Sequence, residues 1–417
     1  MGSLEGMRVL DMTQYEAGTS CTQMLAWLGA DVVKIESPTG DPGRGVGRQL
    51  PGESEDERQY FMNYNANKRS VVINLKSEEG KQVLLDMAPH YDVFVENYGP
   101  GVVEKLGIGY DVLSKINPRL IHARIKGFGL TGPYSEFNCY DWVAQASAGT
   151  FSVTGEPDGP PMHPAPTMSD SGTGIQMALA ITAAYVEQQR TGQGQEIEIS
   201  MQEATTMFMR TLGLDKWGVE AAPRTGIHHG GGVTATYPCK AEDGEGDSND
   251  WAFVMVVTSQ MWDSLCAAMG KPELSIDPRY ADPMSRMEHK SELYDIVASW
   301  TRQHTKREVM SILGPAGVPC SYVFSSLDLF TDPHLVERDF IQKVEHPING
   351  EVTLMRNPIR MRGAEPMKHS PLLDAHTNEV LATDLGMDAS KVSELREAGA
   401  IGSPYAHELA DTAAGDD

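Results

Sequence analysis

Residues 7–36 read MRVLDMTQYEAGTSCTQMLAWLGADVVKIE, and this stretch decides the fold class. Residues 7–12 form a short apolar run typical of a buried strand, and a turn at 13–18 separates it from a predicted helix over 19–28. Residues 31–36 are rich in β-branched side chains and predict a second strand. A strand, a helix and a strand within about 30 residues are typical of a parallel β-α-β unit.

The same alternation continues along the chain. Further strands are predicted at 70–75, 91–96 and 119–126, with helical segments near 77–87 and 102–106. Repeated strand and helix signals predict an α/β fold with a parallel, Rossmann-like sheet. No GxGxxG pattern follows the first strand, which disfavours an enzyme that uses a nicotinamide or flavin dinucleotide.

A second domain is indicated by a change in composition after residue 205. Residues 225–234 (TGIHHGGGVT) are glycine-rich, and an apolar strand signal follows at 251–257 (WAFVMVV). We therefore predict a large Rossmann-like domain built from 1–205 and 328–417. Residues 206–327 are predicted to form a linker and a smaller α+β domain that carries the glycine-rich loop.

The net charge limits the possible partners. The 417 residues include 34 Lys and Arg against 58 Asp and Glu, a formal net charge of −24, which repels nucleic acid and anionic membrane surfaces. No run approaches the ~18 apolar residues that a membrane span needs, and the first residues lack a secretory signal pattern. We expect no nucleic-acid or membrane partner.

Cysteine and histidine usage predicts no metal site. The five cysteines have no CxxC spacing, and the twelve histidines form no HExxH pattern. Five is an odd number, and scattered cysteines without regular spacing fit reduced thiols in a cytoplasmic protein.

Asp170 is the strongest candidate for chemistry. Residues 168–172 (MSDSG) precede an apolar, alanine-rich segment that runs to Val186, so Asp170 is predicted at or just before a helix N-terminus. Asp is a favoured N-cap residue, worth about 1 kcal/mol relative to Ala, which gives one interpretation. A carboxylate held at a buried helix start, with glycines leaving room for a substrate, can also act as a nucleophile. The residue types alone leave both interpretations open.

Short motifs along the chain add a family signal. They are Val-Leu-Asp at 9–11, Glu-Ala-Gly at 16–18, Leu-Gly-Ala-Asp-Val-Val-Lys-Ile-Glu at 28–36, Gly-Asp-Pro-Gly-Arg at 40–44, Asn-Lys-Arg-Ser at 67–70, Val-Glu-Asn-Tyr-Gly-Pro-Gly at 95–101, Lys-Gly-Phe-Gly at 126–129, Asp-Ser-Gly-Thr-Gly at 170–174 and Thr-Gly-Gln-Gly at 191–194. In this order and at these intervals they resemble the family III CoA-transferases over nearly the whole length.

The resemblance implies covalent catalysis on Asp170. Its carboxylate would attack the thioester carbonyl of an acyl-CoA and give a mixed anhydride, and the CoA thiolate would return to form an aspartyl-CoA thioester. A loop containing Gly230, Gly231 and Gly232 would cover the site and exclude water. The substrates would be an acyl-CoA and a small carboxylic acid, with no permanently bound cofactor. Relatives form an interlocked homodimer, which we also expect here.

The resemblance also implies a set of CoA-contacting positions. They are Ala17, Ile73, Asn74, Leu75, Lys76, Asn97, Tyr98, Gly99, Lys105 and Tyr140, with Arg44, Lys68 and Arg69 as further phosphate partners. The structural alternative is a solvated surface charge for each basic residue and a core aromatic for Tyr98.

Three departures place the acid substrate in question. Glu16 stands where family members that use formyl-CoA and oxalate have glutamine, Asn138 stands where they have lysine, and their gating tryptophan is absent from 45–47. A carboxylate beside an anionic substrate is unfavourable unless Glu16 is protonated or turned away. We place Glu16 in the candidate site and expect either oxalate or a larger acid, such as a C4 or C5 dicarboxylate.

Two other functions stay open. The superfamily includes 2-methylacyl-CoA racemases, but the histidine that they use aligns with Tyr140 here, which disfavours α-proton transfer. The other is a non-catalytic acyl-CoA binding protein on the same scaffold, which the presence of Asp170 and the three glycines disfavours.

Overall fold

The computed structural model describes residues 2–49, 52, 54–55, 57–215, 218–230, 232–242, 249–362 and 364–407. Contacts divide the chain into two compact units, which are described separately. The first unit is drawn from Met1–Thr150, His163–Val219 and Asp339–Asp417, and the second from Phe151–Met162 and Glu220–Arg338. The second unit thus includes a segment, Phe151–Met162, that the sequence assigned to the large domain.

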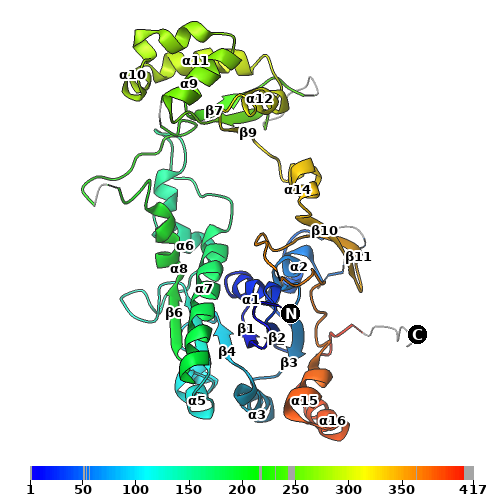
Figure 1. The fold of residues 1–417 in the computed structure, drawn as a ribbon. Helices are drawn as coiled ribbons and strands as arrows, with labels where there is room; N and C mark the ends of the chain where they lie inside the picture. Colours follow the sequence, from blue (N-terminus) through cyan, green and yellow to red (C-terminus); the bar gives the residue numbers. More distant parts are fainter. Residues whose placement is uncertain are drawn as a thin grey trace. The chain divides into compact units, whose positions relative to one another are not determined.

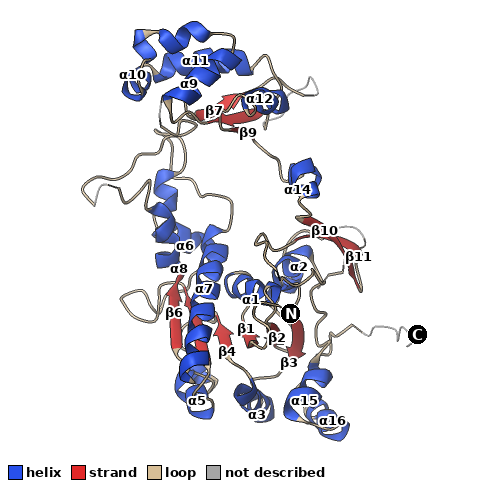
Figure 2. Ribbon diagram, viewed as in Figure 1, coloured by secondary structure: helices blue, strands red, loops and turns tan. Residues whose placement is uncertain are grey.

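A six-stranded parallel sheet forms the centre of the first unit, in the order β3-β2-β1-β4-β5-β6 (Figure 2). The strands are β1 (Arg8–Met12), β2 (Asp31–Glu36), β3 (Arg69–Val72), β4 (Val93–Glu96), β5 (Ile121–Lys126) and β6 (Glu196–Ser200). Leu10 of the central strand pairs with Val33 on one side and Phe94 on the other. The predicted parallel α/β sheet is confirmed.

Helices of the first unit cover both faces of this sheet. They are α1 (Ala17–Trp27), α2 (Gln59–Asn65), α3 (Glu78–Met87), α4 (Val102–Lys105), α5 (Tyr110–Ile116), α6 (Asp141–Ser147), α7 (Met168–Thr191), α8 (Met201–Thr206), α15 (Thr377–Leu385) and α16 (Ala389–Glu397). Because strand side chains alternate between faces, Leu10 packs in a core with α3, α15 and α16, and Val9 packs in a core with α1 and α7. The unit also contains a hairpin of β10 (Ile341–His346) and β11 (Gly350–Met355).

Helices α1 and α7 lie side by side over the sheet (Figure 1). A Cβ atom at Gly174 would lie 2.1 Å from the Ser20 hydroxyl oxygen and 2.7 Å from the Ala17 carbonyl oxygen, so only glycine permits this approach. The predicted small-residue segment after Asp170 therefore packs closely against another helix of its own unit. Helix α1 begins at Ala17, two residues before the predicted start.

The second unit is built on a three-stranded antiparallel sheet in the order β7-β8-β9. Its elements are β7 (Ala235–Pro238), β8 (Trp251–Val254), α9 (Ser259–Ala268), α10 (Pro283–Glu288), α11 (Lys290–Thr301), α12 (Lys306–Leu313), β9 (Cys320–Tyr322), α13 (Asp328–Thr331) and α14 (Pro333–Glu337). Tyr237 and Trp262 are fully buried in its core. Among the described residues of both units, no helix is long and apolar enough to cross a bilayer.

Candidate active site

A cavity of about 230 Å³ opens at the carboxyl ends of β1, β4 and β5 in the first unit. Its walls include the turn after β1, the loop after β4, the end of β5 and the first turn of α7. The strand order reverses between β1 and β4, because β2 and β3 lie to one side of β1 and β4 to β6 to the other. Parallel α/β sheets bind ligands at the carboxyl ends of strands where the order reverses.

Asp170 lines this cavity from the first turn of α7. Thr167 occupies the N-cap position of α7 and its side chain caps no backbone group. Instead, Asp141 at the start of α6 accepts hydrogen bonds at Oδ1 from the backbone N–H groups of Ser169 and Asp170, both at 2.9 Å. Because Asp141 satisfies these helix donors, the Asp170 carboxyl is not the cap of its helix.

Glu16 packs against the same helical turn. Its Oε1 atom accepts hydrogen bonds from the Thr167 hydroxyl at 2.6 Å and the Ser171 hydroxyl at 2.7 Å. These two donors lie three residues before and one residue after Asp170, and Glu16 is 2% exposed. The Glu16 carboxyl is therefore turned toward α7 and held there by neutral donors.

Neighbouring carboxyls change the acidity of the site. Burial, then the charges of Glu16 and Asp141, raise the pKa of Asp170 to about 8. Burial also raises the pKa of Glu16, although hydrogen bonds from Thr167, Ser171 and Tyr64 oppose the shift. A raised pKa in a cavity marks a functional candidate, and a more basic carboxylate is a stronger nucleophile once ionised.

A cysteine also lines the cavity beside these carboxyls. Burial, then the charge of Asp170, raise the pKa of the Cys139 thiol to about 11, so it is neutral near pH 7. Lys126 also lines the cavity and is paired with Glu96, whose Oε1 lies 2.7 Å from Nζ. The positive charge of Lys126 therefore already has a carboxylate partner in the protein.

The structure brings together part of the predicted CoA-contacting set. Ala17, Asn97, Tyr98, Gly99 and Tyr140 line the same cavity as Asp170 and Glu16.

The other predicted CoA-contacting residues lie outside this wall. Ile73 is buried in the core and pairs with Ile401, and the backbone N–H of Asn74 donates to the Ala400 carbonyl at 2.8 Å. Leu75 packs on the same core, Lys76 follows it, and Lys105 ends α4. Their predicted contact with CoA stays a prediction.

The predicted phosphate partners have protein partners in this structure. Arg44 is buried, and its Nε and Nη2 atoms donate to the two oxygens of Glu36 at 2.8 and 2.7 Å. Lys68 pairs with Asp11 at 3.0 Å, and Arg69 pairs with Asp31 at 2.6 Å. A fully buried bidentate pair such as Arg44 with Glu36 holds the fold and does not present its guanidinium to a phosphate.

The glycine-rich loop belongs to the second unit, and Gly231 lies outside the described residues. Gly230 and Gly232 both have positive φ, 97° and 74°. A Cβ at Gly232 would lie 2.5 Å from the Arg286 carbonyl oxygen, whereas a Cβ at Gly230 would meet nothing within 4 Å. Gly232 is thus required by local packing, and the closing of this loop over Asp170 stays a prediction.

Three residues that contact the candidate site were missed by the sequence reasoning. Asp141, Thr167 and Ser171 arrange the first turn of α7 around Asp170. Asp141 lies 29 residues before Asp170, a separation that follows no local spacing rule. Ser171 and Thr167 are ordinary polar residues near a helix start, so only the contact with Glu16 reveals their role.

Comparison with known proteins gives a consistent result. The family model for CoA-transferase family III matches residues 4–377. The chain is 37% identical over 414 residues to a formyl-CoA:oxalate CoA-transferase of Streptomyces coelicolor, covering 96% of this chain and 99% of that protein. It is 35% identical over 422 residues to a formyl-CoA:oxalate CoA-transferase of Rhodopseudomonas palustris, covering 96% and 98%. The crystal structure of a CAIB/BAIF family protein from Brucella suis is similar with a TM-score of 0.80 and 29% identity, covering 92% and 100%.

Proposed function

The chain belongs to CoA-transferase family III, and we propose that it moves CoA from an acyl-CoA thioester to a free carboxylic acid through covalent intermediates on Asp170. The observation that carries this proposal is the Asp170 carboxyl in the wall of the cavity, with a raised pKa and with its helix capped by another residue.

In the first half of the proposed cycle, an Asp170 oxygen attacks the thioester carbonyl carbon. The carbon–sulfur bond breaks, the thiolate of CoA leaves, and a mixed anhydride joins Asp170 to the donor acyl group. The thiolate then attacks the Asp170 carbonyl carbon, which releases the donor as a free carboxylate and leaves an aspartyl-CoA thioester.

The second half reverses these steps with the acceptor. The acceptor carboxylate attacks the aspartyl-CoA carbonyl carbon, displaces the thiolate and forms a second mixed anhydride. The thiolate attacks the acceptor carbonyl carbon, so the new thioester forms and the Asp170 carboxylate is regenerated. Every step is an acyl transfer of similar energy, and the nucleophile is held in place by its helix.

Asp141 and Glu16 support the reaction from the protein side. Asp141 fixes the backbone of Ser169 and Asp170, and Glu16 fixes Thr167 and Ser171 on either side of the nucleophile. Both carboxyls also raise the pKa of Asp170, which makes its ionised form more nucleophilic.

For the acceptor we propose oxalate or a C4 to C5 dicarboxylate. The relatives named above are formyl-CoA:oxalate CoA-transferases, which supports oxalate. Glu16 supports a different acid, because its carboxylate has no amide N–H to donate to a substrate carboxylate at the position where glutamine would have one.

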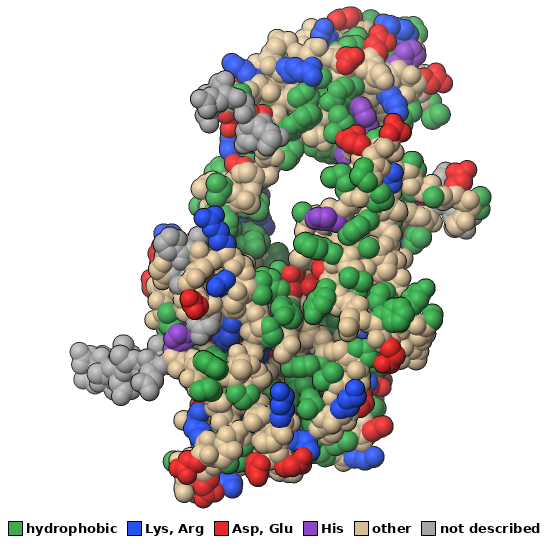
Figure 3. All heavy atoms as spheres, turned by 180° about the vertical axis from the view of Figure 1, so that it is seen from behind, with side chains coloured by type: hydrophobic (Ala, Val, Ile, Leu, Met, Phe, Trp, Pro, Cys, Tyr) green, Lys and Arg blue, Asp and Glu red, His purple; other side chains and the backbone are tan. Residues whose placement is uncertain are grey.

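We also propose a cytoplasmic homodimer, interlocked as the family resemblance implies. Helix α7 buries Met177 and Ile181 against its own unit but exposes Ile175 and Leu179, which are 52% and 71% exposed. Figure 3 also shows patches of exposed hydrophobic side chains on the face opposite to that of Figure 1. Such patches mark protein interfaces, and five free cysteines fit a reducing compartment. Sedimentation that gave an active monomer would contradict the dimer.

The test mixes the protein with formyl-CoA, succinyl-CoA or acetyl-CoA and a panel of acids, and identifies new thioesters and protein adducts by mass. Hydroxylamine should convert the acyl-enzyme into a hydroxamate at Asp170, and Asp170→Asn should lower transfer by about 10³-fold or more.

The control variant is Asp384→Asn. Asp384 is the partner of Arg8 and Tyr91, and it lies far along the chain from the residues that line the cavity. Full transfer by Asp170→Asn would refute the proposal, and α-proton exchange on a 2-methylacyl-CoA would favour a racemase.

A further inference from the structure

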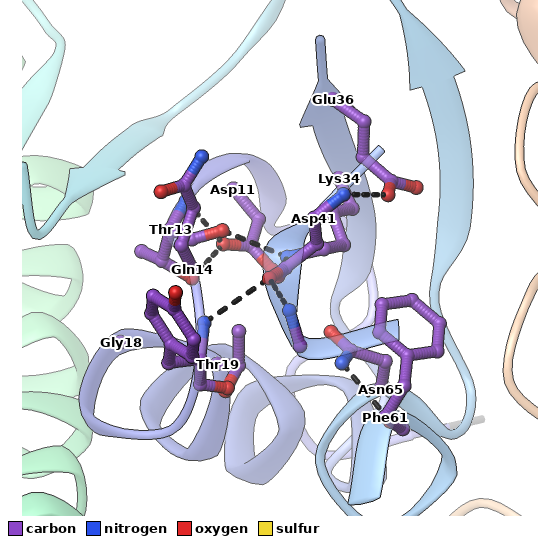
Figure 4. Close-up of polar contacts among 12 residues, drawn as sticks. Asp11, Thr13, Gln14, Gly18, Thr19, Lys34, Glu36, Asp41, Phe61 and Asn65 are labelled. Atoms are coloured by element: carbon purple, nitrogen blue, oxygen red, sulfur yellow. Dashed lines mark hydrogen bonds and ion pairs between the residues drawn. The ribbon is translucent and has the colours of Figure 1, made fainter. Parts of the chain in front are cut away.

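Residues 14–16 form the turn that carries Glu16 from the end of β1 to the start of α1. Figure 4 shows Gln14 of this turn together with Asp11, Lys34 and Asp41. Tyr15 at its centre has φ of 58°, in the left-handed region that a bulky side chain rarely adopts. Such a conformation persists only where the surrounding structure holds it. We call this segment the 14–16 turn.

The side-chain amide of Asn97 bonds both backbone groups of Gln14, the first residue of the turn. Asn97 Oδ1 accepts from the Gln14 N–H at 2.9 Å, and Asn97 Nδ2 donates to the Gln14 carbonyl at 2.9 Å. Asn97 directly follows β4, which lies beside β1 in the sheet. Its two polar groups therefore serve the backbone of the turn.

Asp41 holds the second residue of the turn. Its Oδ1 atom accepts from the Tyr15 N–H at 3.2 Å and from the Gly43 N–H at 2.7 Å. Its Oδ2 atom pairs with Lys34 Nζ at 2.8 Å, and the same Nζ donates to the Thr13 carbonyl at 2.8 Å. Asp41 and Lys34 are both buried, so they reach the turn and not the cavity.

A second buried pair anchors the residues on either side of the turn. Asp11 Oδ1 accepts from the Thr13 N–H at 3.1 Å, and Asp11 Oδ2 pairs with Lys68 Nζ at 3.0 Å. Lys68 also donates to the Thr19 carbonyl in the first turn of α1, at 3.0 Å. The backbone before and after the 14–16 turn is thus fixed to the same charged core.

We propose that Asn97, Asp41 and Lys34 are positioning residues that hold the strained 14–16 turn, and that this turn places Glu16 against Thr167 and Ser171 beside Asp170. Asn97 then acts on the reaction through the turn, in place of the direct CoA contact that family resemblance implies. The inference deepens the proposed function and rests on it for its catalytic consequence.

The test compares Asn97→Asp and Asp41→Asn with the control Asp384→Asn. Asn97→Asp keeps the shape but replaces the donor to the Gln14 carbonyl with an oxygen. Asp41→Asn removes the charge opposite Lys34 at a site that substrate does not reach. Both should slow single-turnover adduct formation on Asp170 by about 10- to 100-fold, with the Kd for CoA within about three-fold of wild type. Asp384→Asn should lose stability and keep the wild-type rate.

Hydrogen exchange of the free protein tests the turn without any reference to catalysis. In Asp41→Asn and Asn97→Asp, the amides of Gln14 and Tyr15 should exchange about ten-fold faster, and those of α3 should not change. Adding Tyr15→Gly should restore part of the rate lost in Asp41→Asn, because glycine adopts positive φ without strain.

Two results would overturn the inference. One is an Asn97→Asp variant with weakened CoA binding and an unchanged adduct rate, which is the signature of direct contact. The other is unchanged exchange at Gln14 and Tyr15 in both variants. If Asp170→Asn kept full transfer while the exchange result held, the proposed function alone would fail.

Discussion

The first unit contains two groups of carboxyls, buried or partly buried, with opposite surroundings. Beneath the 14–16 turn, Asp11 is paired with Lys68 and Glu36 is paired with Arg44. Despite burial, these cations lower the pKa of Asp11 below its usual range and that of Glu36 to about 2. At the cavity, Asp170 is near Glu16 and Asp141, and its pKa is raised to about 8. Desolvation raises the pKa of each of these carboxyls, so the presence or absence of a cation decides the sign of the net shift.

This difference separates the carboxyls that hold the fold from the carboxyl that we propose as the nucleophile. A compensated carboxyl is ionised in the native state and opposes unfolding. An uncompensated carboxyl carries a free-energy penalty when ionised, and sites of this kind concentrate where function requires them. The turn that carries Glu16 contacts the buried ion pairs on one side and the cavity on the other. Residues that stabilise the fold therefore lie within a few positions of the candidate nucleophile's neighbours.

The largest expected effect comes from removing a cation beneath the turn. Lys68→Met leaves the Asp11 carboxylate buried without its partner, and should lower the free energy of unfolding by about 3–5 kcal/mol. Urea denaturation at pH 7 measures the loss. Adding Asp11→Asn should restore part of the lost free energy of unfolding, because the unpaired charge is then absent. A Lys68→Met variant as stable as wild type would contradict the stabilising role of the pair.

A gain in stability is expected at the cavity. The folded pKa of Asp170, about 8, lies above its reference value of 3.8, so wild type loses stability as the pH rises between these values. Asp170→Asn cannot ionise and should be more stable than wild type by roughly 2 kcal/mol above pH 8, after discounting for solvent access, and about equal to it below pH 4. Thermal unfolding across this range checks the sign, and a pH-independent difference would contradict it.

Glu16→Gln tests how far the charge of Glu16 raises the pKa of Asp170. The substitution removes a neighbouring negative charge but leaves an oxygen that Thr167 and Ser171 can still bind. The pKa of Asp170 should fall by about one unit, worth about 1.4 kcal/mol. The pH dependence of adduct formation should move down by the same amount, and an unmoved profile would show that Glu16 is already neutral there.

The smallest effect is expected at an exposed ion pair. Arg69 Nη1 lies 3.1 Å from Glu379 Oε1, and the Glu379 side chain is 57% exposed. Glu379→Gln should change the free energy of unfolding by less than about 0.5 kcal/mol. Urea denaturation in parallel with Lys68→Met measures this, and equal losses would mean that burial does not set the strength of these pairs.

The sequence predicted the sheet because its signals are local. A strand buried on both faces is apolar over its length, and a β-α-β step needs only neighbouring segments, so 7–12 and 31–36 were assigned correctly as strands. The spaced motifs likewise led to the family and to Asp170 as the candidate nucleophile.

The partners of each charged residue could not be predicted in this way. Arg44, Lys68 and Arg69 were interpreted as phosphate partners, but the fold places carboxylates beside all three. The contact between Asn97 and Gln14 joins residues 83 apart, and it exists because β4 lies next to β1.

The sequence by itself therefore determined the fold class, the family and the identity of the candidate nucleophile, since these follow from short-range patterns. Only the tertiary structure decided which buried carboxyls have cations beside them and which do not. These partners depend on strand order and on side chains that meet across long separations in the chain, and they set the charge state on which the proposed chemistry at Asp170 depends.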